Sequence, residues 1–497
     1  MGLLFADRPD DINRVRQSLD EAGFTGENVQ DVIGKEGFAF LGRGELGPLL
    51  RRTRGASRLE TLIRLFLCGV PVELDAAERA LAPLTVGDWT AAEMVEVDGA
   101  EVIGRLKLRP LVLAGNHWVV PYDSSRRAHQ TANYVIGVGI ASVTLAGMTV
   151  RSPVARCLDL GAGSGIQALH ASAHAGHVVA TDRNPRAVAF AEFTMALNSI
   201  GNVEVRQGDL LEPVVGEKFG LIVSNPPFVI SPESRFDYRD SELPGDEICR
   251  RIVTEAPSHL EEDGWCQLLA NWAHLSGTDW RERLGQWFEG TGCDAWVIQR
   301  DVQDAETYAS TWIGQDETDP SQAGDAFDAW MEYYERAGVD SVGFGLITLR
   351  RSESSKPWQR FDEMTQDIAL PCGEAIAATF ARARWLTAMG DDDRKLLNAT
   401  LAVDDGVRLQ ERSQWTAGRW VLEEALLQLT RGLPYVGSID RFGAALIAGC
   451  EGSARLGDLV QRLAAAIGAD ADELTPQILP FVRQLIEQGF LTPTTQP

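Results

Sequence analysis

The chain has 497 residues, which exceeds one ordinary hydrophobic core and favours about three domains. Its formal net charge is -25, and residues 1–130 carry 16 Lys and Arg against 19 Asp and Glu, so the acidic excess lies mainly after residue 130. This balance argues against broad nonspecific binding to nucleic acid, although one local basic face is compatible with it. The seven cysteines include no C-x-x-C pair, which argues against a disulfide framework and a zinc ribbon. With no secretory signal at the N-terminus, we expect a reducing, cytoplasmic localisation.

Residues 1–130 are predicted to form a winged-helix-like accessory domain. Helical spacing and stop signals indicate helices over residues 9–23, 57–68, 75–82 and 87–93. Alternation from residue 94, with an Asp98-Gly99 turn, indicates a hairpin that reaches residue 108.

Such modules often bind nucleic acid, and four arginines form the densest basic cluster of the chain: Arg51, Arg52, Arg54 and Arg58. The alternative is that these arginines form a solvated face of the module and bind no nucleic acid. Because the module is nearly neutral overall, we favour a protein-docking or scaffolding role over direct reading of nucleic acid.

Residues 131–150 contain no formal charge and are long enough to span a membrane. Polar residues and three glycines dilute their hydrophobicity, and a strand-loop-helix pattern begins a few residues later. We therefore expect a buried helix here, and no membrane partner.

From residue 154 the chain alternates strands and helices, which is typical of a mostly parallel, doubly wound sheet. Residues 155–160 predict a strand that runs into a glycine loop over residues 161–165 and a helix over residues 166–175. A dinucleotide fingerprint would need Gly or Ala at position 166, where this chain has Ile166, so NAD is the weaker assignment. Further strands are expected at 177–181, 203–206, 219–223, 264–272, 293–299 and 342–349. The prediction is an α/β catalytic domain over residues 131–352 with a Rossmann-like, seven-stranded sheet.

Polar side chains follow successive strands of this predicted sheet. Asp182, followed by Arg183, ends the second strand, where an acidic side chain suits the two hydroxyls of a ribose. Asp209, followed by Leu210, ends the third strand and suits an adenine amine. Ligands of open α/β sheets bind at the carboxyl ends of the strands, so these side chains predict a nucleoside site.

The stretch Asn225-Pro226-Pro227-Phe228 follows the fourth strand. Its prolines remove backbone donors and stop the strand, which leaves the carbonyls of Asn225 and Pro226 without ladder partners. The Asn225 amide offers a donor and an acceptor, and Phe228 offers a flat apolar face, so together they suit a planar group that carries NH2. A strand-ending turn is the alternative, but the position at the ligand-binding edge favours a substrate site.

With these motifs, residues 130–351 resemble the class I S-adenosylmethionine-dependent methyltransferases that carry Asn-Pro-Pro-Tyr/Phe. Within that class the stretch from Asn225 through Val229 to Pro232 looks like the HemK-type protein glutamine N5-methyltransferases, which usually have Tyr where this chain has Phe228. Ribosomal RNA guanine-N2 methyltransferases also use Phe, generally followed by His. The resemblance implies S-adenosyl-L-methionine as cofactor. The candidate cofactor-binding residues are Asp159, Gly161, Ala162, Gly163, Gly165, Asp182, Arg183, Asp209, Leu210 and Asn225, and the candidate catalytic residues are Asn225, Pro226, Pro227 and Phe228.

The expected function is therefore N-methylation. A protein glutamine amide, as in a release factor, is the first acceptor, and an exocyclic amine of an RNA or DNA base is the alternative. A nucleoside-binding assembly protein is the non-enzyme alternative. His170 and His174 share a helical face but have no acidic third ligand nearby in sequence, so we expect no metal site.

Three other regions carry predictions. Residues 235–240, just after the motif, are expected to form a lid or a substrate-contacting loop. The acidic stretch 301–328 is expected to be a partly solvated insertion, with a helix around residues 325–336. Residues 357–497 are expected to form a C-terminal accessory domain, with helices around 374–389 and 419–430 and a winged-helix-like end, and with a recognition or stabilising role.

Overall fold

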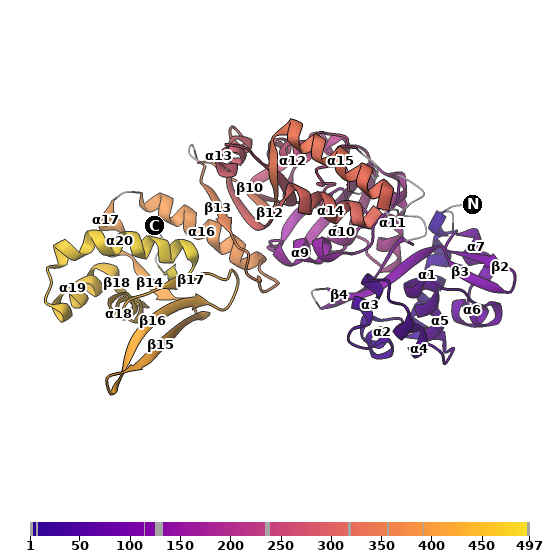
Figure 1. Ribbon diagram of the computed structural model, residues 1–497, viewed down its shortest axis with the longest axis horizontal. Helices are drawn as coiled ribbons and strands as arrows, with labels where there is room; N and C mark the ends of the chain where they lie inside the picture. Colours follow the sequence, from indigo (N-terminus) through magenta and orange to yellow (C-terminus); the bar gives the residue numbers. More distant parts are fainter. Residues whose placement is uncertain are drawn as a thin grey trace. The chain divides into compact units, whose positions relative to one another are not determined.

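The structure is a computed structural model of the chain (Figure 1). The chain divides into two compact units: one comprises Met1–Ala146 and Pro153–Glu363, and the other comprises Gly147–Ser152 and Met364–Pro497. The division into three domains stays a prediction. The structure describes residues 3–5, 8–113, 115–124, 133–233, 239–316, 320–354, 357–390 and 392–494.

The N-terminal part of the first unit combines helices with small sheets. Pro9 opens α1 (Pro9–Ala22), and a capping box between Ser57 and Glu60 opens α5 (Arg58–Leu62), which continues as a π-helical turn to Cys68. The predicted hairpin is β2 (Val95–Asp98) with β3 (Glu101–Gly104), and a second hairpin, β4 (Leu106–Leu113) with β5 (Asn116–Asp123), follows it. The other elements are α2 (Gly26–Ile33), α3 (Gly37–Gly42), α4 (Gly47–Arg52), α6 (Leu74–Leu81), α7 (Val86–Ala91) and β1 (Val72–Glu73), which pairs with β3.

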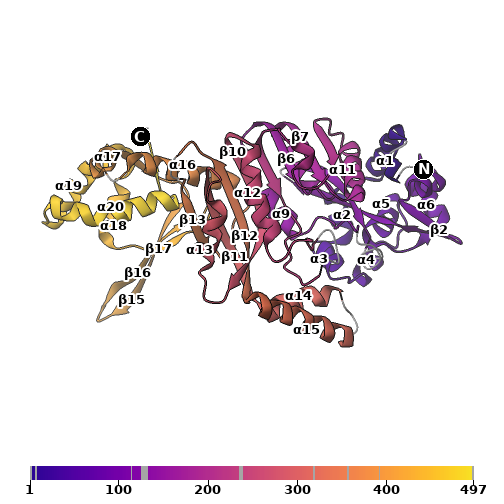
Figure 2. The ribbon, with the colours of Figure 1, turned by 90° about the horizontal axis from the view of Figure 1, so that it is seen from above.

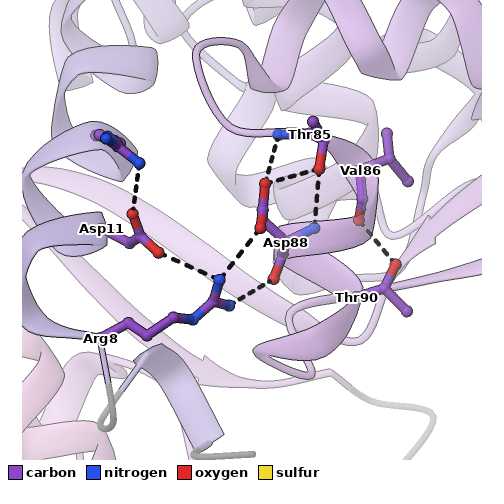
Figure 3. Close-up of polar contacts among 7 residues, drawn as sticks. Arg8, Asp11, Thr85, Val86, Asp88 and Thr90 are labelled. Carbon is purple, nitrogen blue, oxygen red and sulfur yellow. Dashed lines mark hydrogen bonds and ion pairs between the residues drawn. The ribbon is translucent and has the colours of Figure 1, made fainter.

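A polar cluster joins the starts of α1 and α7 (Figure 3). Thr85 and Asp88 form a capping box, in which the Thr85 side chain accepts from the Asp88 N–H and the Asp88 carboxylate accepts from the Thr85 N–H. Arg8, the residue before α1, donates to the Asp88 carboxylate at 3.1 Å and pairs with Asp11 at 3.2 Å. One arginine therefore fixes two helix N-termini to each other, because both present acidic side chains in their first turn.

The central sheet has eight strands in the order β13-β11-β12-β10-β9-β6-β7-β8. Strands β6 to β10 are parallel to one another, and β12 is antiparallel to both β10 and β11. An α/β fold with a mixed, mostly parallel sheet is therefore confirmed. The strands are β6 (Val154–Leu160), β7 (Ala175–Asp182), β8 (Val203–Gln207), β9 (Phe219–Ser224), β10 (Leu260–Leu275), β11 (Cys293–Asp304), β12 (Val339–Arg351) and β13 (Gln359–Glu363).

The expectation of seven strands was wrong by one. The added strand, β13, pairs with β11 at the edge of the sheet. It has five residues, of which only Phe361 is strongly apolar, so the alternation that marks a longer strand is absent from its sequence. An edge strand contacts one neighbour, and less burial leaves less signal in the sequence.

Strand order places a crevice at the centre of the sheet. From β6 the chain moves outward through β7 and β8, and it then returns to the other side of β6 with β9 and β10. The loops after β6 and β9 therefore diverge, and such a switch point is where open α/β sheets bind ligands.

Helices from both parts of the first unit share one hydrophobic core. The N-terminal helices pack against α11 (Pro185–Leu197), whose Phe190 and Phe193 are buried in the same cluster as Trp89. Figures 1 and 2 both show α11 beside α1. On the other face, α12 (Glu247–Glu255) and α13 (Trp280–Gly285) cover β10 and its neighbours.

The segment 131–150 was predicted as a buried helix. The structure places α9 (Ile140–Met148) at its end, preceded by non-helical residues from 133 onward, while residues 131 and 132 lie outside the described residues. Among the described residues, no helix is both long and apolar enough to cross a membrane.

The acidic insertion between β11 and β12 contains two helices, α14 (Ala305–Asp316) and α15 (Pro320–Ala337), which lie side by side in Figure 2. The predicted helix at 325–336 is the second half of α15. Part of the insertion is buried, because Tyr308, Trp330 and Tyr334 lie in one cluster with Val229 and Ile230.

In the second unit one prediction was wrong. Residues 374–389 lie in α16 (Gly373–Met389) as expected, but residues 419–430 form β16 (Arg419–Leu429), which pairs with β15 (Val407–Thr416) and β17 (Val436–Ser438). The helix formers around Glu423 and Glu424 favoured a helix. Period-two burial of Ala425, Leu427 and Leu429 against the core favours the strand instead, so tertiary packing overrides local propensity.

The rest of the second unit is a helical layer around a second small sheet. That sheet has the order β18-β14-β19, and its buried core includes Val482, Leu485 and Phe490. The elements are α17 (Asp393–Asn398), β14 (Thr400–Val403), α18 (Arg441–Ala448), β18 (Glu451–Arg455), α19 (Leu456–Ile467), α20 (Ala471–Gln488) and β19 (Leu491–Pro493).

Candidate active site

A pocket lies at the carboxyl ends of β6, β7, β8 and β9, at the switch point of the sheet. Its walls also include residues 134–137, which precede α9, residues 241–243, and Ile248 and Arg251 of α12. The sequence-predicted residues that line it are Gly161, Ala162, Gly163, Asp182, Arg183, Asp209, Leu210, Asn225 and Pro227. Four predicted residues lie outside this lining: Asp159, Gly165, Pro226 and Phe228.

The glycine loop needs its glycines for two different reasons. Gly161 and Gly163 have φ of 77° and 55°, and a side chain at either would meet open space, so conformation and the approach of a ligand favour glycine there. Gly165 also has a positive φ, but a Cβ there would lie 3.2 Å from the Cα of Ala191 on α11. Gly165 therefore allows close packing of the loop on a helix, which explains its place outside the lining.

Asp182 ties the glycine loop to the start of α11. One carboxylate oxygen accepts from the Gly163 N–H at 2.8 Å, and the other accepts from the Asn184 N–H at 2.9 Å. Asn184 in turn caps α11 by accepting from the Arg186 N–H. A carboxylate oxygen has a second lone pair, so Asp182 can support the loop and still accept from ligand hydroxyl groups.

Asp159 lies in β6, two residues before the glycine loop, and does not line the pocket. Its side chain is buried, and one oxygen accepts from the Ala168 N–H at 2.8 Å, which fixes the start of α10 (Ile166–Ala171). The other oxygen has no hydrogen-bond partner within the described part of the chain. Burial raises the pKa of Asp159 to about 7, and the negative charge of Asp182 adds to that shift. Asp159 therefore holds the helix that directly follows the glycine loop.

Ion pairs line the far wall of the pocket. Asp209 pairs with Arg251 of α12 at 3.6 Å, and Arg183 pairs with Glu242 at 3.2 Å. Arg251 also bonds to Glu255 at 2.7 Å, and its already high pKa is raised further, mainly by that bond. Sequence reasoning missed Arg251 and Glu242 because no short motif connects them to the strand ends.

A second wall missed by sequence reasoning comes from residues 133–137. The buried carboxylate of Asp123 accepts from the Val135 N–H at 3.0 Å and pairs with the guanidinium of Arg186. Asn184 donates to the carbonyl of Asn133 at 3.1 Å. The segment that follows β5 is therefore held against the start of α11, and it closes one side of the pocket. We call residues 133–137 the strap.

The motif after β9 supplies an acceptor without a partner. The strand ends at Ser224, whose hydroxyl donates to the Leu160 carbonyl at 2.8 Å and so joins β9 to the end of β6. The next residue, Asn225, lines the pocket, and its buried side-chain oxygen has no hydrogen-bond partner among the described residues. Leaving such an atom unpaired costs about 1–3 kcal/mol, a cost that a bound donor would remove. Phe228 packs between the sheet core and the α14–α15 cluster.

Two other predictions concern this region. Residues 235–238 of the expected lid lie outside the described residues, while Arg239 and Asp240 are described and buried. His170 and His174 lie with ring centroids 5.7 Å apart. Within the part of the chain that the structure describes, no group of three or more His, Cys, Asp or Glu could hold a metal ion.

Family models match three regions of the chain. Residues 138–289 match the methyltransferase small domain. Residues 21–105 match a domain of unknown function, DUF7059, and residues 377–493 match another, DUF7782. The pocket-bearing sheet thus carries a methyltransferase small domain, a family whose members use S-adenosyl-L-methionine.

Curated relatives resemble the central part of the chain. It is 32% identical over 129 residues to the release factor glutamine methyltransferase of Xylella fastidiosa (strain Temecula1), which covers 24% of this chain and 47% of the relative. It is 34% identical over 119 residues to the ribosomal RNA small subunit methyltransferase C of Idiomarina loihiensis, covering 24% of this chain and 32% of the relative. The chain spans about half the length of the first relatives it matches. It is therefore a distant, partial homologue of release factor glutamine methyltransferases and of other S-adenosylmethionine-dependent methyltransferases.

A likeness to solved structures is also found. The T. thermophilus 16S rRNA N2 G1207 methyltransferase (RsmC), solved with AdoMet and guanosine, is 13% identical to this chain. The likeness covers 60% of this chain and 68% of that chain, with a TM-score of 0.28.

Proposed function

We propose that the protein is an S-adenosylmethionine-dependent N-methyltransferase and that its acceptor is a glutamine side-chain amide of another protein. The observation that carries this proposal is the buried oxygen of Asn225, which has no hydrogen-bond partner in the described ranges and lies at the wall of a pocket that also contains the glycine loop and Asp182. That oxygen suits an NH2 group, which is a donor.

The residues of the pocket fit the cofactor. S-adenosyl-L-methionine supplies an activated methyl group on a sulfonium centre. Asp182 and the strap would hold its nucleoside, and the open space over Gly161 and Gly163 lets a ligand approach the backbone. The carboxylates of Asp182 and Asp209 favour a cationic ligand.

The chemistry that this chain must add is alignment. Asn225 would accept from the acceptor NH2 group and direct the nitrogen lone pair toward the methyl group. Holding the two reactants in line lowers the activation free energy of methyl transfer by up to about 7–11 kcal/mol. No nucleophilic side chain takes part, and the proton released from nitrogen leaves to solvent. The Asn225 oxygen stabilises the positive charge that develops on nitrogen.

Charge favours a protein acceptor over a nucleic acid. Both arginines of the pocket lining are paired with carboxylates, and the chain has a net charge of -25. In the N-terminal basic cluster, Arg52 donates to the Ile33 carbonyl and Arg58 bonds to Glu21 and Ala82. These internal bonds remove arginine donors that phosphate groups would need.

The second candidate is methylation of an exocyclic amine in RNA. It is favoured by Phe228, by the resemblance to a ribosomal RNA methyltransferase, and by the exposed side chains of Arg51 and Arg54. We also propose that both accessory regions are winged-helix-like, since such modules would present the acceptor to the pocket. The non-enzyme alternative keeps the nucleoside pocket and uses these regions for assembly.

The test is transfer of a labelled methyl group. The protein is incubated with tritiated S-adenosylmethionine and an extract of cells that lack its gene, and the product is divided between protease and nuclease treatment. Label released by protease supports the glutamine proposal, and label released only by nuclease overturns it in favour of RNA. Asn225→Ala should lower the rate of methyl transfer about a hundredfold or more. Calorimetry should show that this variant still binds the cofactor. Unchanged transfer by Asn225→Ala would overturn the catalytic role of this residue.

A further inference from the structure

The helices α14 and α15 pack against the chain segment that leaves the candidate active site. Val229 and Ile230, directly after the Asn-Pro-Pro-Phe motif, are buried in one cluster with Tyr308 of α14 and Tyr334 of α15. The prolines of the motif have already ended β9, so these two residues reach the cluster without a strand ladder.

Two tyrosines replace that missing ladder at Ile230. The Tyr308 hydroxyl accepts from the Ile230 N–H at 3.1 Å, and the Tyr334 hydroxyl donates to the Ile230 carbonyl at 2.7 Å. Asn271 of β10 donates to the Tyr308 hydroxyl at 2.9 Å, which orients it from the sheet side. Both backbone groups of a fully buried residue are thus satisfied by side chains of the insertion.

A third tyrosine holds the other end of the same segment. The Tyr333 hydroxyl accepts from the Gly245 N–H at 2.9 Å. Between these two anchors, Ser241, Glu242 and Leu243 line the pocket. Ile230 and Gly245 are therefore fixed to α14–α15, and residues 241–243, just before Gly245, contribute a wall of the pocket.

Contacts within the segment add to this arrangement. Val229 donates its N–H to the Arg239 carbonyl at 3.0 Å, and Ser231 donates to the Asp240 carboxylate at 3.1 Å. Arg239 and Asp240 form a buried ion pair at 3.0 Å, and the Arg239 guanidinium lies 5.5 Å from the ring centroid of Trp312 on α14. Residues 229–231 and residues 239–240 therefore lie together, packed against the insertion.

We propose that Tyr308, Tyr333 and Tyr334 are positioning residues, which hold Ile230 and Gly245 in place and thereby set the wall of residues 241–243 against which the methyl acceptor lies. This inference rests on the proposed function. It assigns to the insertion between β11 and β12 a role in acceptor geometry, since the tyrosines act through the backbone of the segment and touch no reacting atom. A displacement of about 1 Å at such a wall can reduce transfer about a hundredfold.

The tyrosines can play this part throughout the physiological pH range. Burial raises the pKa of both Tyr308 and Tyr334 above the ordinary value for a phenol, so both stay protonated. Their hydroxyls then keep the donor and acceptor roles that Ile230 requires.

The experiment compares Tyr308→Phe, Tyr333→Phe and Tyr334→Phe with Phe327→Leu. The tyrosine variants keep the ring and lose only the hydroxyl, while Phe327→Leu disturbs packing in the same helical hairpin without removing a hydroxyl bond. Three quantities are measured for each: thermal unfolding, hydrogen exchange of the peptides containing Ile230 and Gly245, and methyl transfer in the assay described above with S-adenosylmethionine affinity as a parallel readout.

We expect faster exchange at Ile230 in Tyr308→Phe and at Gly245 in Tyr333→Phe, but at neither site in Phe327→Leu. The kcat for methyl transfer should fall about tenfold or more in the tyrosine variants, a larger factor than the loss of cofactor affinity. Wild-type kcat in all three tyrosine variants, or an equal loss in Phe327→Leu at matched thermal stability, overturns the positioning role alone. A wild-type protein that transfers no methyl group at all overturns the proposed function, and the positioning role falls with it.

Discussion

The carboxylate of Asp182, at the end of β7, accepts a hydrogen bond of 2.8 Å from the N–H of Gly163, at the middle of the loop that follows β6. Two neighbouring parallel strands are thereby joined at the edge where the sheet opens. The same carboxylate accepts from the Asn184 N–H, so one side chain joins the glycine loop, the end of β7 and the N-terminus of α11.

Asp182→Asn should weaken cofactor binding. The amide keeps the size of the side chain but loses the negative charge, and its NH2 end cannot accept from both Gly163 and Asn184. We expect the dissociation constant for S-adenosylmethionine to rise at least about tenfold, which corresponds to about 1.4 kcal/mol. Calorimetry measures it. Glu192→Gln, an exposed acidic residue of α11, is the matched control and should bind as the wild type does.

Gly163→Ala should cost both stability and affinity. With φ of 55°, an alanine at this position is strained by about 1–2 kcal/mol, although its methyl group would meet open space. The loop should relax and lose the bond to Asp182. Gly201→Ala is the control, because Gly201 also faces open space but has no positive φ. Equal effects of the two substitutions in urea unfolding and in calorimetry would contradict the role given to the left-handed conformation.

The buried pair of Asp123 and Arg186 should link stability to cofactor binding. Arg186→Met leaves a carboxylate buried without its cation, which costs about 3–5 kcal/mol. The double variant with Asp123→Asn removes that charge and should recover part of the stability. Because Asp123 also holds Val135 of the strap, we expect both variants to bind cofactor less tightly than the wild type. Retained affinity with reduced stability would show that the strap contributes to folding and not to the cofactor site.

The parts of the site that could be predicted from the sequence are those set by strand ends. Asp182 and Asn225 each follow an apolar run that predicts a strand, and Asp209 comes shortly after the alternating residues 203–206. Parallel strands bring their carboxyl ends to one edge. The glycine spacing before Ile166 was enough to disfavour a dinucleotide. Local pattern and one topological rule place these residues together.

The parts that could not be predicted depend on long-range packing. Arg251 reaches the pocket from a helix, and Tyr308, Tyr333 and Tyr334 bond to residues that precede them by 78 to 104 positions. Nothing in their local sequence distinguishes them from ordinary core aromatic residues. The error at residues 419–430 has the same origin, since pairing with β15 decides the conformation there.

Asp159 should give the protein an unusual dependence of stability on pH. Its pKa is about 7 in the folded protein, mainly because of burial, and about 3.9 in an unfolded chain. Between these two values the folded state binds the extra proton, so the free energy of unfolding should fall as pH rises from about 4 to about 7. A carboxylate whose pKa is lowered by a salt bridge would give the opposite slope.

Asp159→Asn removes this titration. Relative to the wild type, the variant should therefore gain in free energy of unfolding as pH rises from 5 to 8, because the wild type alone must then bury a charged carboxylate. Urea unfolding at pH 5, 6, 7 and 8 measures the difference between the two proteins, which cancels the titration of all other groups. Asp10→Asn, at an exposed position in the first turn of α1, is the control and should show a constant difference over the same range. Parallel profiles for the wild type and Asp159→Asn would mean that the buried oxygen without a partner is ionised at no cost, contrary to its burial behind the glycine loop.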